Sequence, residues 1–141
     1  MQTADLHIAE GDPDLDARLS KELDAYNVAA CGISDQQEFT VKVEDSDGLV
    51  AGLSGWTWGT CAGIGMVWVR DDHRRGGLGS RLLAAAEQVA RARGCERITV
   101  SSFTFQAPAF YERHGFVEFA RTAGLPVSGQ ADVHFVKMLI R

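Results

Sequence analysis

Glycine and arginine are concentrated between residues 70 and 80, where an apolar, strand-like run leads into a helix-like one. The segment reads RDDHRRGGLGS, so that Arg74 and Arg75 directly precede a run of glycines. The first N–H groups of a helix have no partner within the helix, and its dipole adds positive potential there. Because glycine lets a phosphate approach the backbone, this pattern predicts a pyrophosphate site at the start of the helix.

Two familiar phosphate-binding patterns do not describe this turn. No Gly-Lys pair followed by Ser or Thr appears at the spacing of a P-loop. The dinucleotide fingerprint requires a small residue at position 82, where the chain has Leu82. The strand before the turn is also expected in an antiparallel meander rather than at the start of a strand–helix–strand unit. A small nucleotide-binding domain stays open as an alternative.

A second segment whose residues could take part in a reaction is APAFYERHGF, residues 107–116. It is expected to form a short helix that carries Tyr111. The two segments together resemble the GNAT family of N-acetyltransferases. The motif of that family is Arg or Gln, two residues, Gly, one residue, and Gly or Ala, which Arg74, Gly77 and Gly79 match. The second segment resembles the A-x-x-F-Y-x-x-x-G-F ending of the family, and the resemblance covers about residues 49–120.

The resemblance implies a reaction and a set of residues. The reaction is transfer of an acetyl group from acetyl-CoA to a primary amine, by direct attack in a ternary complex, which makes the chain an acyltransferase. Tyr111 would protonate the departing CoA thiolate, and a strand amide near Val67 would stabilise the oxyanion. Residues 67–69 would hold pantetheine and the turn would hold the pyrophosphate. The resemblance thus assigns to CoA binding Val67, Trp68, Val69, Arg74, Arg75, Gly76, Gly77, Leu78, Gly79 and Ser80.

Two departures from the family pattern affect the chemistry. Many members carry Asn seven residues before the tyrosine, where this chain has Thr104. Many also carry a Glu on the strand before the turn, whereas residues 61–66 contain no acid. An alkylammonium ion must lose a proton before it attacks. A water chain, Glu22 or Asp35 would have to accept it, and a non-catalytic CoA-binding or sensing module is the alternative function.

The acceptor is the least specified part of the sequence. Trp56, Trp58 and Phe103 are candidate substrate contacts, although Trp56 and Trp58 also suit core packing or a dimer surface. The expected partner is a small-molecule or peptide amine. The resemblance also allows a homodimer. Ser101 and Ser102 are interpreted as strand serines without a catalytic triad.

The overall composition limits the class of protein. The chain of 141 residues is the size of one domain, expected over residues 1–141, with 45% hydrophobic and 23% charged residues. The net charge of -5 argues against nucleic-acid binding, and the basic cluster at 70–75 is assigned to a small phosphate ligand. No segment approaches a membrane span or a signal peptide, so a cytoplasmic location is expected. The three cysteines are expected as buried free thiols, and the scattered histidines predict no metal site.

Periodicity and turn residues predict the remaining elements. Leu6 and Ile8 suggest a short first strand, and a helix is expected from Asp12-Pro13 to about Ala30. An antiparallel meander is expected over 38–70, followed by a helix over 75–93 that buries Leu78, Leu82, Ala85, Ala86 and Val89. Further elements are a strand over 98–105, a short helix over 108–114, and strands from 115 and 134. The predicted fold is α/β (α+β), with a mixed, mostly antiparallel sheet of about seven strands flanked by helices.

Overall fold

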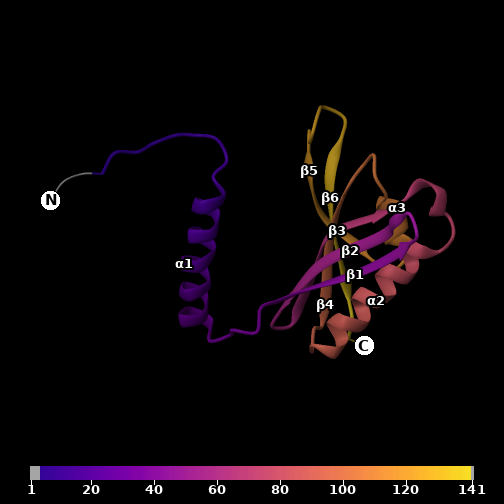
Figure 1. The fold of residues 1–141 in the computed structure, drawn as a ribbon, viewed down its shortest axis with the longest axis horizontal. Coiled ribbons are helices and arrows are strands. Elements are labelled where there is room, and N and C mark those ends of the chain that lie inside the picture. Colours follow the sequence, from indigo (N-terminus) through magenta and orange to yellow (C-terminus); the bar gives the residue numbers. More distant parts are fainter. Residues whose placement is uncertain (1–3, 141) are drawn as a thin grey trace. The chain divides into compact units, whose positions relative to one another are not determined.

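A computed structural model describes residues 4–140 of the chain (Figure 1). Contacts within the chain divide it into two compact units, one ending at Ser34 and the other beginning at Asp35. Each unit is described separately below. Within the described residues, no helix has both the length and the apolar character that a membrane crossing requires.

The first unit contains one helix, α1 (Pro13–Cys31), close to the range predicted for it. Asp12 caps its start, where the side chain accepts a hydrogen bond from the Leu15 N–H at 3.1 Å. Gly32 ends it in the left-handed conformation and donates its N–H to the Val28 carbonyl at 2.8 Å. The strand predicted around Leu6 and Ile8 is wrong, because residues 4–9 pair with no other strand. Two alternating apolar residues do not form a strand without a partner ladder.

The second unit is a mixed sheet in the order β1-β2-β3-β4-β6-β5. It has six strands, one fewer than predicted, because the expected first strand is absent. The strands are β1 (Gln37–Asp45), β2 (Gly48–Trp58), β3 (Cys61–Val69), β4 (Arg97–Phe103), β5 (Val117–Ala123) and β6 (Ala131–Met138). The helices are the 3-10 turn η1 (Asp71–His73), α2 (Leu78–Ala92) and α3 (Pro108–Arg113).

The predicted meander is confirmed, since β1 pairs with β2 and β2 with β3, both antiparallel. The turn between β1 and β2 is stabilised locally: the side chain of Asp45 accepts a hydrogen bond from the Asp47 N–H at 2.8 Å, and Gly48 takes a φ of 114°. Among the described strands, only the contact between β3 and β4 is parallel. Figure 1 shows the β5–β6 hairpin running in a different direction from β1–β3, so the sheet turns strongly across β4.

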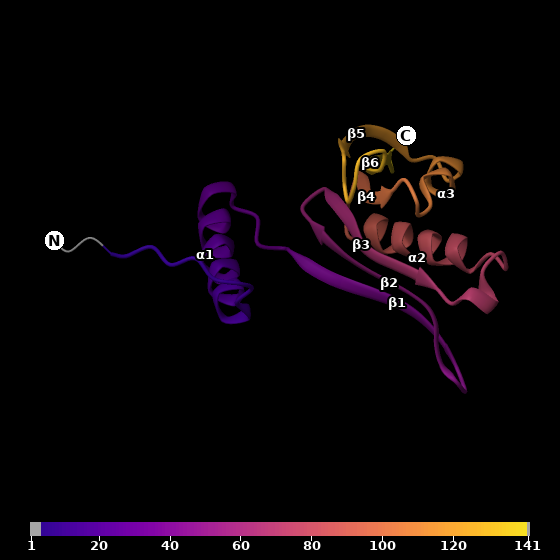
Figure 2. The same ribbon diagram turned by 90° about the horizontal axis from the view of Figure 1, so that it is seen from above.

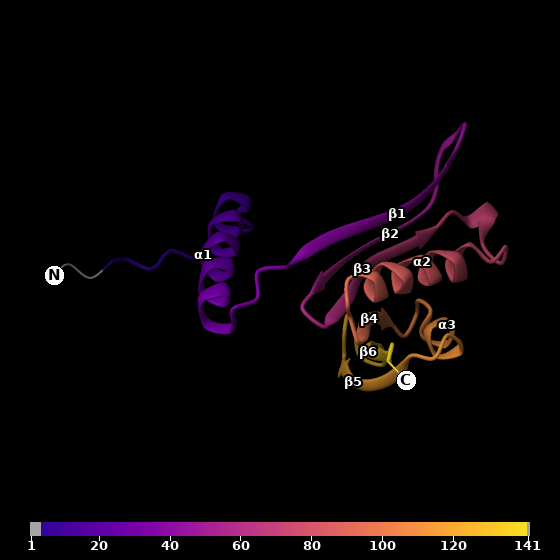
Figure 3. The ribbon, with the colours of Figure 1, turned by 90° about the horizontal axis from the view of Figure 1, so that it is seen from below.

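Helix α2 lies along one face of the sheet, beside β1–β3 and next to α3 (Figures 2 and 3). It starts three residues later than predicted, at Leu78, because Arg75 and Gly77 before it are left-handed. Leu82 and Ala86 are buried as predicted, and Leu78 and Val89 are half-buried against the core. Leu83 and Ala90, which were not in the predicted stripe, are buried as well. The most enclosed side chains of the core are Phe135, Leu82, Leu83, Ile98, Val50 and Val133.

The three thiols differ in their surroundings. Cys95 is buried as predicted, whereas Cys61 is half-buried and Cys31 is exposed, which corrects the expectation for these two. All three are free thiols. Cys95 also helps to end α2, since its N–H donates to the Ala90 carbonyl at 2.9 Å, beyond the left-handed Gly94.

Candidate active site

The two central strands β3 and β4 part after only three residue pairs. Cys61, Ala62 and Gly63 of β3 lie opposite Arg97, Ile98 and Thr99 of β4. Beyond this point β3 stays paired with β2 as far as Val69, and β4 stays paired with β6 as far as Phe103. Each strand therefore presents an unpaired backbone edge toward the other. Backbone N–H and C=O groups in such a position require partners, and an extended ligand with amide groups can supply them.

A β-bulge in β3 explains where the strands separate. Ile64 lies opposite Gly55 and Met66 lies opposite Ser54, so that Gly65 has no partner in β2. A bulge bends its strand and increases the local twist, and bulges are common beside active sites. The bend falls immediately after the last β3–β4 pair, which ends at Gly63. This bulge was not predicted from the sequence, although the alternation Gly63-Ile64-Gly65 in an apolar strand is a signal for it.

The residues predicted to hold pantetheine lie on β3 beyond the bulge. Val67 and Val69 are half-buried and pack against the core, while Trp68 is exposed on the other face. This segment includes the unpaired edge that faces the gap. The carbonyl of Val69 already accepts a hydrogen bond from Nε of Arg74 at 2.8 Å. Arg74 thus fixes the start of the turn to the end of β3.

The predicted phosphate turn has two left-handed residues, Arg75 (φ 70°) and Gly77 (φ 84°). Arg75 is the one described non-glycine residue with positive φ, a conformation that costs about 1–3 kcal/mol and concentrates at ligand sites. α2 then begins at Leu78, and Gly77 provides no side-chain cap. The first N–H groups of α2 are therefore left without a side-chain acceptor, as an anion site requires.

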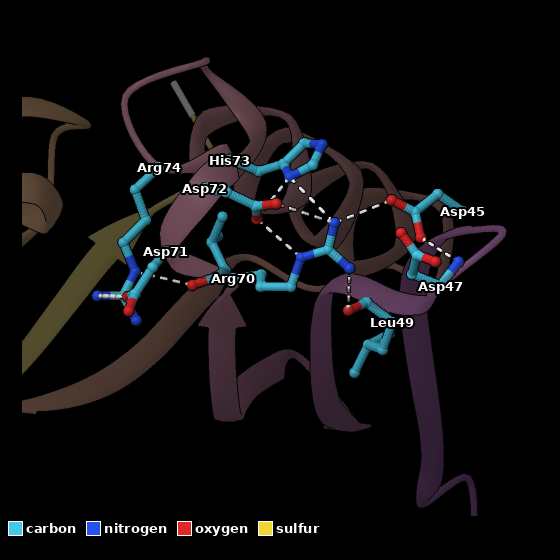
Figure 4. Close-up of polar contacts among 9 residues, drawn as sticks. Asp45, Asp47, Leu49, Arg70, Asp71, Asp72, His73 and Arg74 are labelled. Atoms are coloured by element: carbon cyan, nitrogen blue, oxygen red, sulfur yellow. Dashed lines mark hydrogen bonds and ion pairs between the residues drawn. The ribbon is translucent and has the colours of Figure 1, made fainter.

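Arg70 is part of the basic cluster assigned to phosphate, yet its guanidinium is already occupied (Figure 4). It donates to Asp72 at 2.7 Å through Nε and to Asp45 at 2.9 Å through Nη2. These bonds hold the pKa of the Asp72 carboxyl at about 2 and lower that of Asp45. His73 contacts the same Asp72 oxygen at 2.9 Å. Arg70 thus joins the β1–β2 turn to η1. Arg74 is also occupied, since it pairs with Asp71 at 2.6 Å and donates to the Val69 carbonyl, so Arg75 is the arginine of the cluster without an acidic partner among the described residues.

The start of α2 is packed tightly against α3. A Cβ added at Gly79 would lie 3.3 Å from the ring of Phe110, so glycine allows the close approach. Ser80 and Nε2 of His114 are 2.8 Å apart, and Nδ1 of His114 is 2.8 Å from the Phe110 carbonyl. A carbonyl only accepts, so Nδ1 carries the hydrogen and the neutral ring accepts from the Ser80 hydroxyl at Nε2. His114, which the sequence analysis did not single out, therefore joins the two helices that frame the turn.

Tyr111 lies on α3 and is 7% exposed, with its ring against Phe110, Phe116 and Phe135. Burial raises the pKa of Tyr111 above its ordinary value of 10.0. The fully buried, unpartnered polar atoms of the described side chains do not include its hydroxyl. The ring is thus fixed by packing, and its hydroxyl keeps access to the surface. Tyr111 thus packs in the core, and this packing is compatible with an acid role.

A cleft of about 380 Å³ opens where β3 and β4 part. Trp56, one of the three predicted substrate contacts, lines it, whereas Trp58 and Phe103 do not. The indole of Trp56 lies across Gly63, where an added Cβ would meet the ring at 2.3 Å. Phe103 instead stacks on Phe105 with ring centroids 5.3 Å apart. The residues lining the cleft are Trp56, Gly63, Ile64, Gly65, Thr99, Val100, Ser101, Phe119, His134 and Phe135.

The cleft contains a polar group that the sequence analysis missed. Nδ1 of His134 lies 2.8 Å from the Ser101 hydroxyl, and its Nε2 lies 3.0 Å from the Thr122 hydroxyl. These residues come from β4, β5 and β6, and Ser101 and Thr122 precede His134 by 33 and 12 residues in the sequence. No local motif joins them, so only the strand order brings them together. Of the two acids considered as proton acceptors, Asp35 accepts a hydrogen bond from the Gly59 N–H at 2.9 Å, and Glu22 pairs with Arg18 on α1 at 3.3 Å.

Two curated proteins resemble the chain in sequence. "Acetyltransferase Atu2258" of Agrobacterium fabrum is 31% identical over 121 residues, which are 85% of this chain and 88% of that protein. "Blasticidin-S acetyltransferase" of Streptomyces morookaense is 37% identical over 98 residues, which are 69% of this chain and 63% of that protein. The chain thus matches less than two thirds of the second relative's length.

Solved structures share the fold. A putative acetyltransferase from Agrobacterium tumefaciens has a TM-score of 0.83 and 28% identity, covering 98% of this chain and 99% of that one. An aminoglycoside 6'-N-acetyltransferase solved with coenzyme A has a TM-score of 0.66 and 18% identity, covering 92% and 93%. At that identity the likeness concerns the fold alone. The model of the acetyltransferase (GNAT) family matches residues 5–116. With the parted strands, the glycine turn and the relatives in agreement, the chain belongs to the GNAT family and is an acyltransferase.

Proposed function

We propose that the protein transfers an acetyl group from acetyl-CoA to a primary amine, by direct attack of the amine in a ternary complex. The observation that carries this proposal is the gap between β3 and β4, which has an unpaired backbone edge along its length and the left-handed turn at its end. An extended arm with amide groups and a terminal pyrophosphate matches both parts. CoA has this form.

The residues of the chain fit such a donor. The edge of β3 from Val67 to Val69 would pair with the amides of pantetheine, while the first N–H groups of α2 and the positive end of its dipole would face the pyrophosphate. Arg75 is exposed beside these N–H groups and would add charge. Ser80 would contribute its N–H, because its hydroxyl bonds to His114. Acetyl-CoA supplies the activated acetyl group as a thioester.

Tyr111 is the proposed acid for the departing thiolate. A thiol has an ordinary pKa of ~8.5 and a tyrosine one of ~10. Burial raises the pKa of Tyr111, and burial also raises the pKa of the Cys61 thiol in β3 and of the Cys95 thiol just before β4. A thiolate that leaves in a similarly dry setting would be more basic for the same reason. The difference between the two groups therefore stays small, and the tyrosine is protonated and ready to donate at neutral pH.

The proposed acceptor class is a small-molecule amine. The resemblance to blasticidin-S acetyltransferase supports this class, since the name of that relative includes a small-molecule substrate. The cleft beside the parted strands has aromatic surfaces from Trp56 and Phe119, which suit an amine with an apolar or planar body. Acidic residues outnumber basic ones by 19 to 14, which also favours a cationic acceptor.

A screen of amines with acetyl-CoA tests the proposal. Aminoglycosides, nucleoside antibiotics, polyamines, amino acids and a peptide amine would each be incubated with protein and acetyl-CoA, while free thiol and the mass of the acceptor are followed. We expect stoichiometric thiol release and a mass gain of one acetyl group for at least one member. The alternative, a non-catalytic CoA-binding module, is favoured by the absence of an acid in Cys61–Met66. It predicts that CoA raises the melting temperature while no amine is acetylated.

A further inference from the structure

The cleft between β3 and β4 has no carboxylate to take a proton from an ammonium ion. Of its ten lining residues, His134 is the one with a titratable side chain. An amine that arrives as an ammonium ion has no lone pair for attack until a proton is removed. Imidazole is the side chain that changes charge in the neutral range, so His134 has suitable chemistry at a suitable place.

Hydroxyl groups lie on both sides of the ring of His134. The Ser101 hydroxyl is 2.8 Å from Nδ1, and the Thr122 hydroxyl is 3.0 Å from Nε2. A hydroxyl donates or accepts as needed. The neutral ring thus accepts from Ser101 and donates to Thr122, while the charged ring donates to both. Neither protonation state leaves a nitrogen without a partner, which is what a reversible proton acceptor requires.

We propose that His134 accepts the proton of the acceptor ammonium ion through the hydroxyl of Ser101. This role rests on the proposed acetyl transfer. The ammonium N–H donates its proton to Oγ of Ser101, and the hydroxyl proton of Ser101 passes to Nδ1 of His134. The neutral amine then attacks the thioester carbon, forming the C–N bond. As the C–S bond breaks, the thiolate takes the Tyr111 proton and the nitrogen releases its second proton to water. Tyr111 then regains a proton from solvent, and His134 releases its proton to solvent.

The surroundings of His134 suit a cationic acceptor. From β5 the ring of Phe119 lies 6.3 Å from the imidazole, centroid to centroid, and Thr122 adds its hydroxyl. From β4 Ser101 faces it, and on β6 itself Asp132 lies two residues away on the same face. Among these neighbours Asp132 is the acidic residue, and its Oδ1 is fully buried without a hydrogen-bond partner in the described residues. A carboxylate at this position would attract an ammonium ion toward the cleft.

The His134→Gln variant tests this role, because Gln keeps a hydrogen bond to a hydroxyl but takes no proton. The measurement is kcat/KM for the best acceptor from pH 6 to pH 9.5 at saturating acetyl-CoA, with CoA affinity measured in parallel. We expect a loss of about 10²-fold at pH 7 that shrinks as pH rises, because free amine increases toward the alkylammonium pKa of ~10.4. CoA affinity should stay unchanged. Ser101→Ala should lose about tenfold and keep the wild-type pH dependence, since water can replace the relay.

A second substrate separates proton transfer from positioning. A fluorinated analogue of the acceptor, neutral at pH 7, needs no initial deprotonation, so His134→Gln should turn it over within a few-fold of wild type. Arg121→Gln, on the neighbouring strand and outside the cleft lining, is the matched surface control and should keep the wild-type profile. If the wild type is active and the pH profile of His134→Gln runs parallel to the wild-type profile, the role of His134 is overturned and the proposed function stands. A wild type that binds CoA but acetylates no amine would overturn the proposed function, and this role with it.

Discussion

The proposed donor side and the proposed acceptor side of the site are built in different ways. The donor side uses backbone: the unpaired edge of β3, the left-handed Arg75 and Gly77, and the first N–H groups of α2. The acceptor side uses side chains: Trp56 from β2, Ser101 from β4 and His134 from β6. A backbone site depends on glycines at fixed local spacing, whereas a side-chain site depends on which strands are neighbours. Changes on the two sides should therefore have different kinetic consequences.

The largest effect is expected at Tyr111, the proposed acid for the departing thiolate. Tyr111→Phe keeps the ring that packs against Phe110, Phe116 and Phe135 and removes only a hydroxyl that forms no hydrogen bond within the described residues. We expect kcat to fall by about 10²-fold, as for loss of a general acid, with melting temperature and CoA affinity nearly unchanged. Steady-state kinetics, thermal melts and calorimetric titration of CoA would measure these three quantities. Unchanged turnover would rule out the acid role.

A pair of glycines separates an effect on CoA binding from the backbone strain that any left-handed alanine causes. Gly77 (φ 84°) and Gly94 (φ 82°) stand at the two ends of α2, and an added Cβ would contact nothing within 4 Å at either position. Alanine at each should cost about 1–2 kcal/mol of unfolding free energy. Only Gly77→Ala should also weaken acetyl-CoA binding, by roughly 5–30-fold, because relaxation of the turn moves the N–H groups away from the phosphates. Equal CoA affinity in the two variants would contradict a phosphate role for this turn.

A third change acts on the acceptor side. In Gly63→Ala the new methyl group would lie within 2.3 Å of the present position of the Trp56 ring, so the indole must move away from β3. We expect the KM of the acceptor to rise several-fold, the KM of acetyl-CoA to stay the same, and stability to fall by about 1–3 kcal/mol from overpacking. Trp56→Phe, which keeps an aromatic wall without the clash, is the matched variant and should raise only the acceptor KM. A change in the KM of acetyl-CoA instead would show that the two sides are not separable.

The same contrast explains what was predictable from the sequence. Hydrophobic periodicity and turn residues predicted the meander, α1 and α2, because these features are local. The missing first strand was not predictable, since Leu6 and Ile8 alternate whether or not a partner exists. The glycine turn was recognisable because its residues are contiguous. His134 was not, because its partners Ser101 and Thr122 are 33 and 12 residues away in sequence.

Arg70 gives the smallest expected effect and tests whether the basic cluster really divides into structural and binding parts. In Arg70→Gln, CoA affinity should stay within about twofold of wild type, because Asp45 and Asp72 already occupy the guanidinium. Stability should change with pH instead. Asp72 has a folded pKa of about 2 against an ordinary 3.8, so it contributes stability that is fully present above 3.8 and is lost as pH falls toward 2. Without Arg70, the largest cause of that shift, the fall in melting temperature between pH 5 and pH 2 should be smaller than in wild type.

The Asp72→Asn variant supplies the control, because it removes the titrating carboxyl while keeping the shape of the side chain. Arg70→Gln in the Asp72→Asn background should leave a smaller pH-dependent difference, confined to what Asp45 contributes through its own lowered pKa. Thermal melts at pH 2, 3, 4 and 5 for the four proteins of this cycle would measure it. If Arg70→Gln instead lowered CoA affinity tenfold with the acid dependence intact, Arg70 would belong with Arg75 to the phosphate site. The hydrogen bonds of Asp45 and Asp72 to Arg70 would then result from the conformation of the turn and would not stabilise it.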